Sequence, residues 1–505
     1  MKKILILFAC SFMLFATTQA QNPGRNKFIT DSLQTYITRA LTNWRIPGAS
    51  VFIVKDNRIV LMRGYGIKEM GLNNKVDENT LFMIGSNTKA FTATAVAMAF
   101  LDKKLSLDDK VTRFLPDFKL ENKAATELLT VRDLLCHRLG FQTFQGDFAF
   151  YNSNLTRSEI MTRLGQMKAV YPFRTKWGYT NSAFLTAGEI IPKVADQNWD
   201  IYLKEKIFAP LGMGNTLGLS VAMPKSINRT VPHTIADGRL IAIPYANIDN
   251  MAPAGSISST ASDMGKWVMA LLNNGKVGAK QVLPNAAIQA TRQPQDIVGE
   301  NENGEFLLYG LGWIVQNYHG HKVIWHTGGV SGFVSSVTLV PDQNLGIVIL
   351  TNTDQNNLIE TLNWNVIDAY LNLPYRDYSG ISLNEFKTYK AAELAADKKL
   401  RDSVLLNPRP ALSTNNYEGK YNNPLYGNLT VEKGENNDLN IRFEHHPKMF
   451  ARLQPLGGNR FYVTFSDPVF GKAIFPFNVQ NGKVTGVRVK VADFVEEGAY
   501  EFKKI

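Results

Sequence analysis

Three apolar runs follow one another in residues 321–352, which read HKVIWHTGGVSGFVSSVTLVPDQNLGIVILTN. β-Branched and aromatic residues fill each run, and Pro341-Asp342-Gln343-Asn344 supplies a turn between the second and the third. The pattern therefore predicts consecutive antiparallel strands near the end of the main domain.

The other end of this domain carries a second strand pair. VFIVK, the turn Asp56-Asn57 and RIVLMRGYG predict a hairpin, and residues 29–45 before it have the spacing of an amphipathic helix. Residues 107–312 carry helical segments between Gly- and Pro-rich loops. We expect an α/β fold in which the two chain ends pair in one antiparallel sheet and helices cover it.

The composition changes after about residue 414, where short alternating runs predict a separate small all-β domain, barrel-like or a curved sheet. The charged, Ala-rich stretch 383–406 before it ends at Pro408 and looks like a linker. We divide the chain into a leader (1–20), a main domain (21–382), a helical linker (383–413) and the β domain (414–505). Few contacts are expected to cross such a boundary, so the β domain should be separable near Leu406.

The overall composition is that of a globular protein. Of 505 residues, 45% are apolar and 20% charged, which argues against a disordered, collagen-like or coiled-coil chain. The formal charge is +11, but no run of five or six basic residues occurs, so we expect no nucleic-acid partner. A soluble basic protein is the simplest interpretation, and affinity for an anionic envelope polymer is the alternative.

The first residues, MKKILILFACSFMLFATTQAQ, have the form of a secretory leader cleaved after Ala20, which predicts a periplasmic or secreted protein. Bulky Phe8 and the apolar run beyond Cys10 argue against lipid attachment at Cys10. No later segment has the pattern of a transmembrane helix. Cys136 would be the only thiol of the mature chain, so no intrachain disulfide is expected.

The candidate chemistry begins at Ser86-Asn87-Thr88-Lys89. A Ser and a Lys three residues apart share one helical face, and the Ser lies at the helix start, where N–H groups favour negative charge. A desolvated Lys could lose its proton near neutral pH and deprotonate the Ser. An N-cap Ser beside a surface Lys is the alternative. However, the nearly all-apolar AFTATAVAMAF that follows predicts a buried helix, where a Lys needs a purpose.

Two further segments carry polar candidates. Tyr179 and Asn181 precede an apolar helix, where a Tyr could relay a proton and an Asn amide could bind a substrate amide. His326-Thr327-Gly328-Gly329 ends a predicted strand, whose small residues would let a ligand approach the backbone. Metal and cofactor motifs are missing from the sequence, and we expect neither a metal nor a cofactor.

The order Ser-x-x-Lys, Tyr-x-Asn and His-Thr-Gly resembles the serine β-lactamase and penicillin-binding-protein superfamily, specifically its class C branch. PGASVFIVKDNRIV, LTVRDLLCHRLG, PAGSISSTASDMGKWV and YGLGW are similar as well, over roughly residues 30–375. The tail from about 414 resembles the small lipocalin-like domain sometimes fused to such hydrolases. The resemblance implies a serine hydrolase with acylated Ser86, and proton transfer by Lys89 and Tyr179. It also implies a substrate site formed by Asn181, His326, Thr327, Gly328 and Gly329, with the N–H groups of Ser86 and Gly329 as the oxyanion hole.

The substrate and the base stay open. D-Amino-acid peptides, among them peptidoglycan fragments, small esters and β-lactams all suit such an enzyme, as carboxypeptidase, esterase or β-lactamase. Either Lys89 or Tyr179 could be the general base, and the oligomeric state is not predicted. Two sites depart from the family pattern: His326 stands where a Lys is commoner, and Arg138-Leu139 stand where small hydroxylated residues are common. His137 is interpreted as structural. The alternative function is a non-catalytic protein that keeps the fold and binds cell-wall fragments or a partner.

Overall fold

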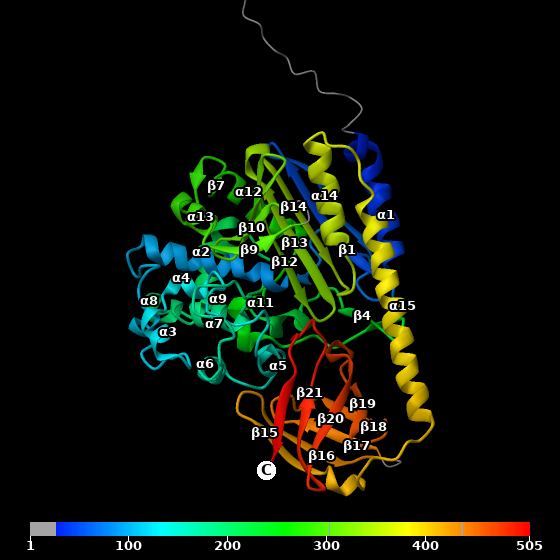
Figure 1. Cartoon of the computed structure of the whole chain (residues 1–505). Coiled ribbons are helices and arrows are strands. Elements are labelled where there is room, and N and C mark those ends of the chain that lie inside the picture. The colour runs from blue at the N-terminus through cyan, green and yellow to red at the C-terminus, as the bar shows by residue number, and fades with distance from the viewer. Residues whose placement is uncertain (1–26, 302–303, 436–437) are drawn as a thin grey trace, which may run out of the picture.

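The computed structural model describes residues 27–301, 304–435 and 438–505, so the expected leader and Cys10 lie outside the described residues (Figure 1). An antiparallel sheet of eight strands forms the main domain, as the sequence predicted. Among the described residues, no helix is both long enough and apolar enough to cross a bilayer. The strands lie in the order β2 (Arg58–Gly66), β1 (Gly48–Lys55), β14 (Leu345–Thr351), β13 (Phe333–Val340), β12 (His321–Val330), β11 (Ile314–Tyr318), β10 (Phe306–Tyr309) and β9 (Asp296–Glu300).

The two ends of the domain pair with each other in this sheet, next to its β2 edge. β1 pairs with β2 through the predicted hairpin, where Asp56 and Asn57 have φ of 51° and 60°, as a two-residue turn between twisted strands requires. On its other edge β1 pairs with β14, with Ala49 opposite Thr351.

Alternate residues of the central strands enter two apolar clusters, so the sheet is buried on both faces. Val51 and Ile53 of β1 pack with helices on one face, and Phe52 and Val54 with helices on the other. Figure 1 shows α1 (Leu33–Trp44), α14 (Leu358–Tyr370) and α15 (Tyr378–Leu405) against the first face, and α2 (Thr88–Leu101) and α12 (Ala261–Leu272) behind the second. The helix predicted at 29–45 starts as a π-helical turn, Phe28–Ser32, before α1.

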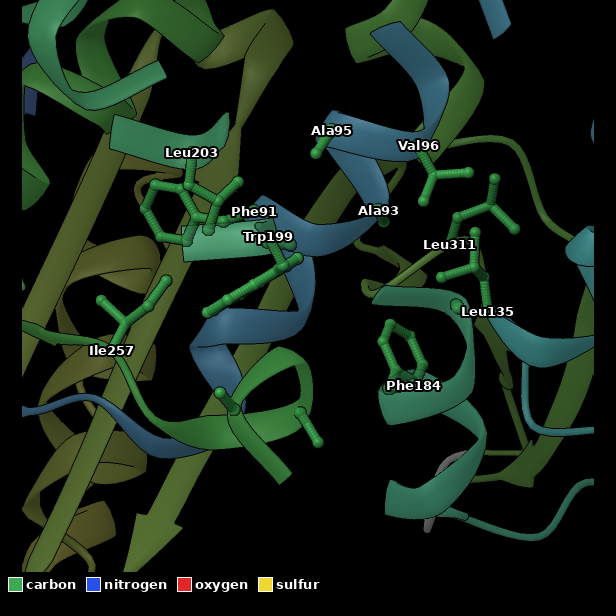
Figure 2. Packing of buried hydrophobic residues seen from close by; sticks show 14 of the residues in the cluster. Phe91, Ala93, Ala95, Val96, Leu135, Phe184, Trp199, Leu203, Ile257 and Leu311 are labelled. Carbon is green, nitrogen blue, oxygen red and sulfur yellow. The ribbon is translucent and has the colours of Figure 1, made fainter. Parts of the chain in front are cut away.

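Helix α2 runs through the larger cluster and is buried almost all round. Phe91, Val96 and their neighbours contact side chains from several surrounding helices (Figure 2). The helix predicted to start at Ser86 begins with a 3₁₀ turn, Gly85–Asn87, that leads into α2. Short helices are spread through the middle of the chain, namely α3 (Lys123–Leu128), α4 (Val131–Leu134), α5 (Asp147–Phe150), α6 (Arg157–Leu164), α7 (Asn181–Gly188), α8 (Ile191–Ala195), α9 (Trp199–Leu203), α10 (Ala209–Leu211), α11 (Ala252–Gly255) and α13 (Asn285–Thr291).

A closed eight-stranded barrel forms the C-terminal part of the chain, as expected of a small all-β domain. Helix α15 starts five residues before the predicted linker and runs along one side of the molecule toward the barrel (Figure 1). Its Asp397 accepts a 2.5 Å hydrogen bond from the Tyr462 hydroxyl of the barrel. The barrel strands are β15 (Gly419–Asn423), β16 (Gly427–Lys433), β17 (Leu439–Phe443), β18 (Phe450–Pro455), β19 (Arg460–Phe465), β20 (Lys472–Gln480), β21 (Lys483–Val489) and β22 (Tyr500–Lys504).

The main domain inserts a residue into the apolar cluster of the barrel. Phe148 of α5 is buried there, with its ring stacked on His446 and Tyr500 at centroid distances of 5.1 and 5.7 Å. Ile243 belongs to the same cluster. The expectation that few contacts join the two parts is therefore wrong, because side chains of the main domain are buried in the apolar cluster of the barrel.

Candidate active site

Ser86 lies in a tight turn between β3 (Phe82–Met83) and α2. Gly85, just before it, has φ of 52°, and a Cβ there would stand 2.8 Å from the backbone nitrogen of Gly329. Gly328 is equally constrained, because a Cβ on it would lie 1.9 Å from the carbonyl oxygen of Ile84. These glycines bring the Ser86 turn into direct contact with β12, since no side chain separates the two backbones.

Lys89 lies one helical turn after Ser86, and its ammonium group has three partners. Nζ is 3.0 Å from Ser86 Oγ, 2.6 Å from Asn181 Oδ1 and 2.8 Å from the carbonyl oxygen of Ala254. The side chain is fully buried, and this desolvation lowers the pKa of Lys89 to about 7, although the nearby Asp147 opposes the shift. A substantial fraction of Lys89 is therefore neutral at physiological pH.

The geometry defines where the lone pair of neutral Lys89 points. Two of its three partners, the oxygens of Asn181 and Ala254, are carbonyl oxygens that only accept hydrogen bonds. The two N–H bonds of the neutral amine satisfy them. The remaining lone pair then faces the Ser86 hydroxyl, which can donate its proton.

Tyr179 and Asn181 reach this centre from the start of α7. The Tyr179 ring lies 4.7 Å from Lys89 Nζ, and its hydroxyl interacts with Ser86. Burial raises the pKa of Tyr179 far above its usual value, so the phenol stays protonated. Asn181 donates from Nδ2 to Asp147 Oδ2 at 2.6 Å, and burial together with the charge of Glu496 raises the pKa of Asp147 to about 8.

β12 provides a free strand edge beside Ser86. Its pairing with β11 ends at Trp325, whereas its pairing with β13 continues through Gly329 to Val330. Gly329 is exposed and Thr327 half-buried, so extended substrate backbone has access to this edge. The structure thus brings Ser86, Lys89, Tyr179, Asn181 and the segment of β12 from His326 to Gly329 together.

The β-lactamase family model matches residues 33–371, which is the sheet domain that carries this centre. The chain belongs to the β-lactamase family. A second family model, a domain of unknown function (DUF3471), matches residues 406–504, the barrel.

Relatives of this β-lactamase-family chain include an unguisins hydrolase of Aspergillus campestris, 29% identical over 80% of this chain and 78% of the relative. The protein flp of Staphylococcus aureus is 26% identical over 70% and 69%. Among solved structures, the octameric penicillin-binding protein homologue of Pyrococcus abyssi has a TM-score of 0.62 at 20% identity, covering 94% of this chain and all of its own. A D-stereospecific amidohydrolase of Streptomyces has a TM-score of 0.56 at 21% identity, covering 67% and 97%. The last two likenesses concern the fold.

His326, where the family more commonly has Lys, lies at the end of a chain of hydrogen bonds that runs through His137 and Tyr309. The backbone groups at the two ends of this chain define the tautomers of both histidines. The Thr180 N–H donates to His137 Nδ1 at 3.0 Å, so His137 carries its proton on Nε2, 3.2 Å from the Tyr309 hydroxyl. His326 Nδ1 lies 2.5 Å from the Thr327 carbonyl oxygen and therefore carries a proton, which leaves Nε2 to accept from Tyr309 at 3.0 Å. Burial and the charge of Lys89 lower the pKa of His326 to about 3. The strand therefore carries a neutral group at this position.

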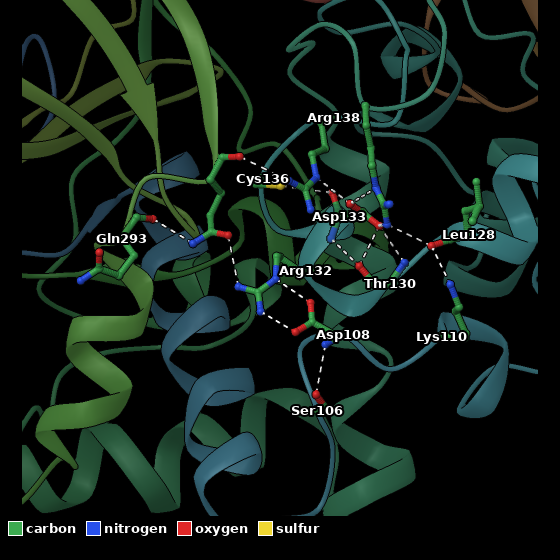
Figure 3. Close-up of polar contacts among 12 residues, drawn as sticks. Ser106, Asp108, Lys110, Leu128, Thr130, Arg132, Asp133, Cys136, Arg138 and Gln293 are labelled. Atoms are coloured by element: carbon green, nitrogen blue, oxygen red, sulfur yellow. Dashed lines mark hydrogen bonds and ion pairs between the residues drawn. The ribbon is translucent and has the colours of Figure 1, made fainter.

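Arg138, at the second departure from the family pattern, forms an ion pair that stabilises the segment carrying His137 (Figure 3). Its guanidinium bonds the fully buried Asp133 at 2.6 Å, and Arg174 bonds the other oxygen of Asp133 at the same distance. Asp133 also caps α4 through Thr130. The guanidinium of Arg138 is therefore engaged by Asp133 and by the carbonyl oxygen of Gln295.

Sequence reasoning missed three members of this site: Asp147, the Ala254 carbonyl and Tyr309. Tyr309 and Ala254 lie in YGLGW and PAGS, segments that the resemblance includes without giving them a role. Asp147 has no local signal, because an acidic residue between Gly146 and Phe148 is ordinary in a loop. The described residues contain no group of three or more His, Cys, Asp or Glu that could hold a metal ion.

Proposed function

We propose that this β-lactamase-family serine hydrolase cleaves esters or amides through an acyl-enzyme on Ser86, in the manner of the class C branch, with Lys89 as the general base. One observation carries the proposal: Lys89 Nζ lies 3.0 Å from Ser86 Oγ while two carbonyl oxygens occupy its other hydrogen-bonding directions. Tyr179 is a poor candidate for the base, because burial holds its pKa far above the physiological range.

The reaction follows from these positions. Lys89 takes the proton of Ser86 as Oγ forms a bond to the substrate carbonyl carbon. The N–H groups of Ser86 and Gly329 stabilise the resulting oxyanion. The leaving alkoxide or amine receives the proton from Lys89 through the Tyr179 hydroxyl and departs. Water then attacks the acyl carbon and gives a proton to the same pair. The bond between the acyl carbon and Ser86 Oγ breaks, the pair returns that proton to Oγ, and the acid leaves with Ser86 restored.

The neutral strand favours uncharged substrates. A Lys at position 326 would attract the carboxylate of penicillins and cephalosporins, whereas His326 is buried and neutral. We therefore propose small esters and D-amino-acid amides in preference to β-lactams. The names of an unguisins hydrolase relative and a D-stereospecific amidohydrolase with the same fold are in keeping with amide substrates.

The leader motif at residues 1–20 is the basis for proposing that the enzyme acts in the periplasm or outside the cell. Fractionation of cells that express the full chain tests this proposal. The expected result is a mature chain that begins at Gln21 and is recovered outside the cytoplasm, and an uncleaved cytoplasmic chain would contradict it.

Covalent labelling separates an enzyme from a non-catalytic binder. A fluorophosphonate should label the wild type at Ser86, and Ser86→Ala should lose both labelling and turnover of a p-nitrophenyl ester. Thr88→Ala would be a poor control, because its hydroxyl accepts from the backbone N–H of Ile257. Exposed Ser158→Ala serves instead. Normal turnover by Ser86→Ala would refute the proposal.

A further inference from the structure

We propose that Glu496, which belongs to the C-terminal barrel, is a positioning residue for the general base Lys89. It acts through the turn that carries Asp147, and through Asn181. This inference rests on the proposed function, because it assigns a role within the same reaction. It gives the barrel a direct part in the chemistry of the main domain.

The contact between the barrel and this turn is polar, short and buried. Glu496 lies in the connection between β21 and β22 and is 3% exposed. One carboxylate oxygen accepts from the N–H of Gly146 at 2.7 Å, and the other from the N–H of Phe148 at 3.0 Å. The Tyr426 hydroxyl of the barrel donates to the first oxygen at 2.8 Å. A carboxylate that accepts two backbone N–H groups from one turn fixes the orientation of that turn.

Asp147 lies between the two residues that Glu496 holds, and the chain of contacts continues from it to the base. Asp147 Oδ2 accepts from Asn181 Nδ2 at 2.6 Å, and Asn181 Oδ1 accepts from Lys89 Nζ at 2.6 Å. Asn181 must keep its amide in one orientation for both bonds to form. Glu496 therefore determines where Asp147 stands, and Asp147 determines how Asn181 presents its oxygen to Lys89.

The charges of the same groups are coupled. Glu496 faces Asp147, Tyr426 and Tyr500, and its carboxylate raises the pKa of Asp147. Asp147 in turn raises the pKa of Lys89 when it is ionised. By keeping Asp147 protonated, Glu496 thus favours the neutral base. Lys89 also faces the hydroxyl of Ser86, the ring of Tyr179 and the neutral rings of His137 and His326.

Replacement of Glu496 with Gln tests the inference through a pH profile. The measurement is the second-order rate constant for fluorophosphonate labelling of Ser86 in the full chain, from pH 5 to 9. In Glu496→Gln the negative charge is lost, Asp147 ionises more readily and the pKa of Lys89 rises. The acidic limb of the profile should therefore move to higher pH by roughly 0.5 to 1 unit. Glu497→Gln, the exposed neighbour, removes the same charge and should leave the profile unchanged.

The possible outcomes are separable. A Glu496→Gln protein that labels with the wild-type profile overturns the inference, even if its thermal stability is lower. If Glu496→Gln does not fold, Tyr426→Phe removes only one donor to Glu496. It should then move the limb in the same direction by less, and an unmoved limb overturns the inference. A wild type that is not labelled at any pH refutes the proposed function itself, and the inference with it.

Discussion

The side-chain oxygen of Asn181 accepts a 2.6 Å hydrogen bond from Lys89, and this bond makes Asn181 a support for the base. One N–H of the same amide is taken by Asp147. Only the second N–H is left for a substrate carbonyl. Asn181, which the sequence suggested as a substrate ligand, thus also supports the base, and mutation can separate these two roles.

Asn181→Asp should move the pH dependence of catalysis upward. A carboxylate 2.6 Å from Lys89 Nζ stabilises the ammonium form and raises the pKa of Lys89 above about 7. The acidic limb of kcat/KM for a p-nitrophenyl ester should shift up by about one unit or more. Asn73→Asp at an exposed position is the matched control. An unchanged limb with a lower plateau would show that Asn181 only binds substrate.

Lys89→Met should remove a pH-dependent loss of stability together with the activity. The pKa of Lys89 in the folded chain, about 7, lies below its ordinary value of 10.5, so between these pH values the unfolded chain binds a proton that the folded chain does not. The free energy of unfolding of the wild type therefore falls by about 1.4 kcal/mol per pH unit as pH falls from 10.5 to 7, and Lys89 causes no further loss below pH 7. As pH falls from 10.5 to 7, the Tm of Lys89→Met should rise relative to that of the wild type. Below pH 7 the difference should stay constant. A constant Tm difference from pH 10 to 7 would contradict the pKa assigned to Lys89.

His326→Lys should improve the use of a cephalosporin relative to an ester. The new ammonium supplies the positive charge that neutral His326 lacks, at the cost of the bond from Tyr309. We expect the ratio of the two kcat/KM values to rise about tenfold, and Tyr309→Phe to leave the ratio unchanged. Since burial keeps His326 neutral, no change near pH 6 should depend on it in the wild type. Efficient cephalosporin hydrolysis by the wild type at pH 8 would refute this view.

Phe494→Ala should weaken the binding of substrates with large apolar groups. This exposed barrel residue has a ring atom 3.3 Å from where a Cβ on Gly329 would stand, beside the free edge of β12. We expect KM for a phenylacetyl ester to rise by roughly threefold to tenfold, with kcat and the acetyl ester nearly unaffected. Phe450→Ala, an exposed Phe on β18, is the control. Equal effects on both esters would place Phe494 outside the substrate site.

A chain truncated after Leu406 should lose solubility or activity, which reverses the separability expected from the sequence. Truncation exposes Phe148 and leaves the N–H groups of Gly146 and Phe148 without Glu496. Light scattering and the labelling rate should show aggregation or at least a tenfold loss. A soluble fragment that labels at the wild-type rate would restore the original expectation.

The sequence predicted what local patterns encode. Alternation and turn residues located β1, β2 and the strands of residues 321–352, and the apolar run after Lys89 predicted a buried helix. Contacts between distant segments had no such signal. Glu496 and Glu497 are adjacent and chemically alike, yet one is buried against Gly146 and the other exposed. Only the three-dimensional placement of the barrel distinguishes them.

The pairing of Ala49 with Thr351 has a consequence for how this enzyme is made. β1 leaves the ribosome early, but its inner neighbour β14 is synthesised only after the entire helical middle of the domain. Until then, a strand rich in Val, Ile and Phe has an open hydrogen-bonding edge on which another nascent chain could assemble. Closing so long a loop is slow, so productive folding of this sheet competes with aggregation during and after synthesis.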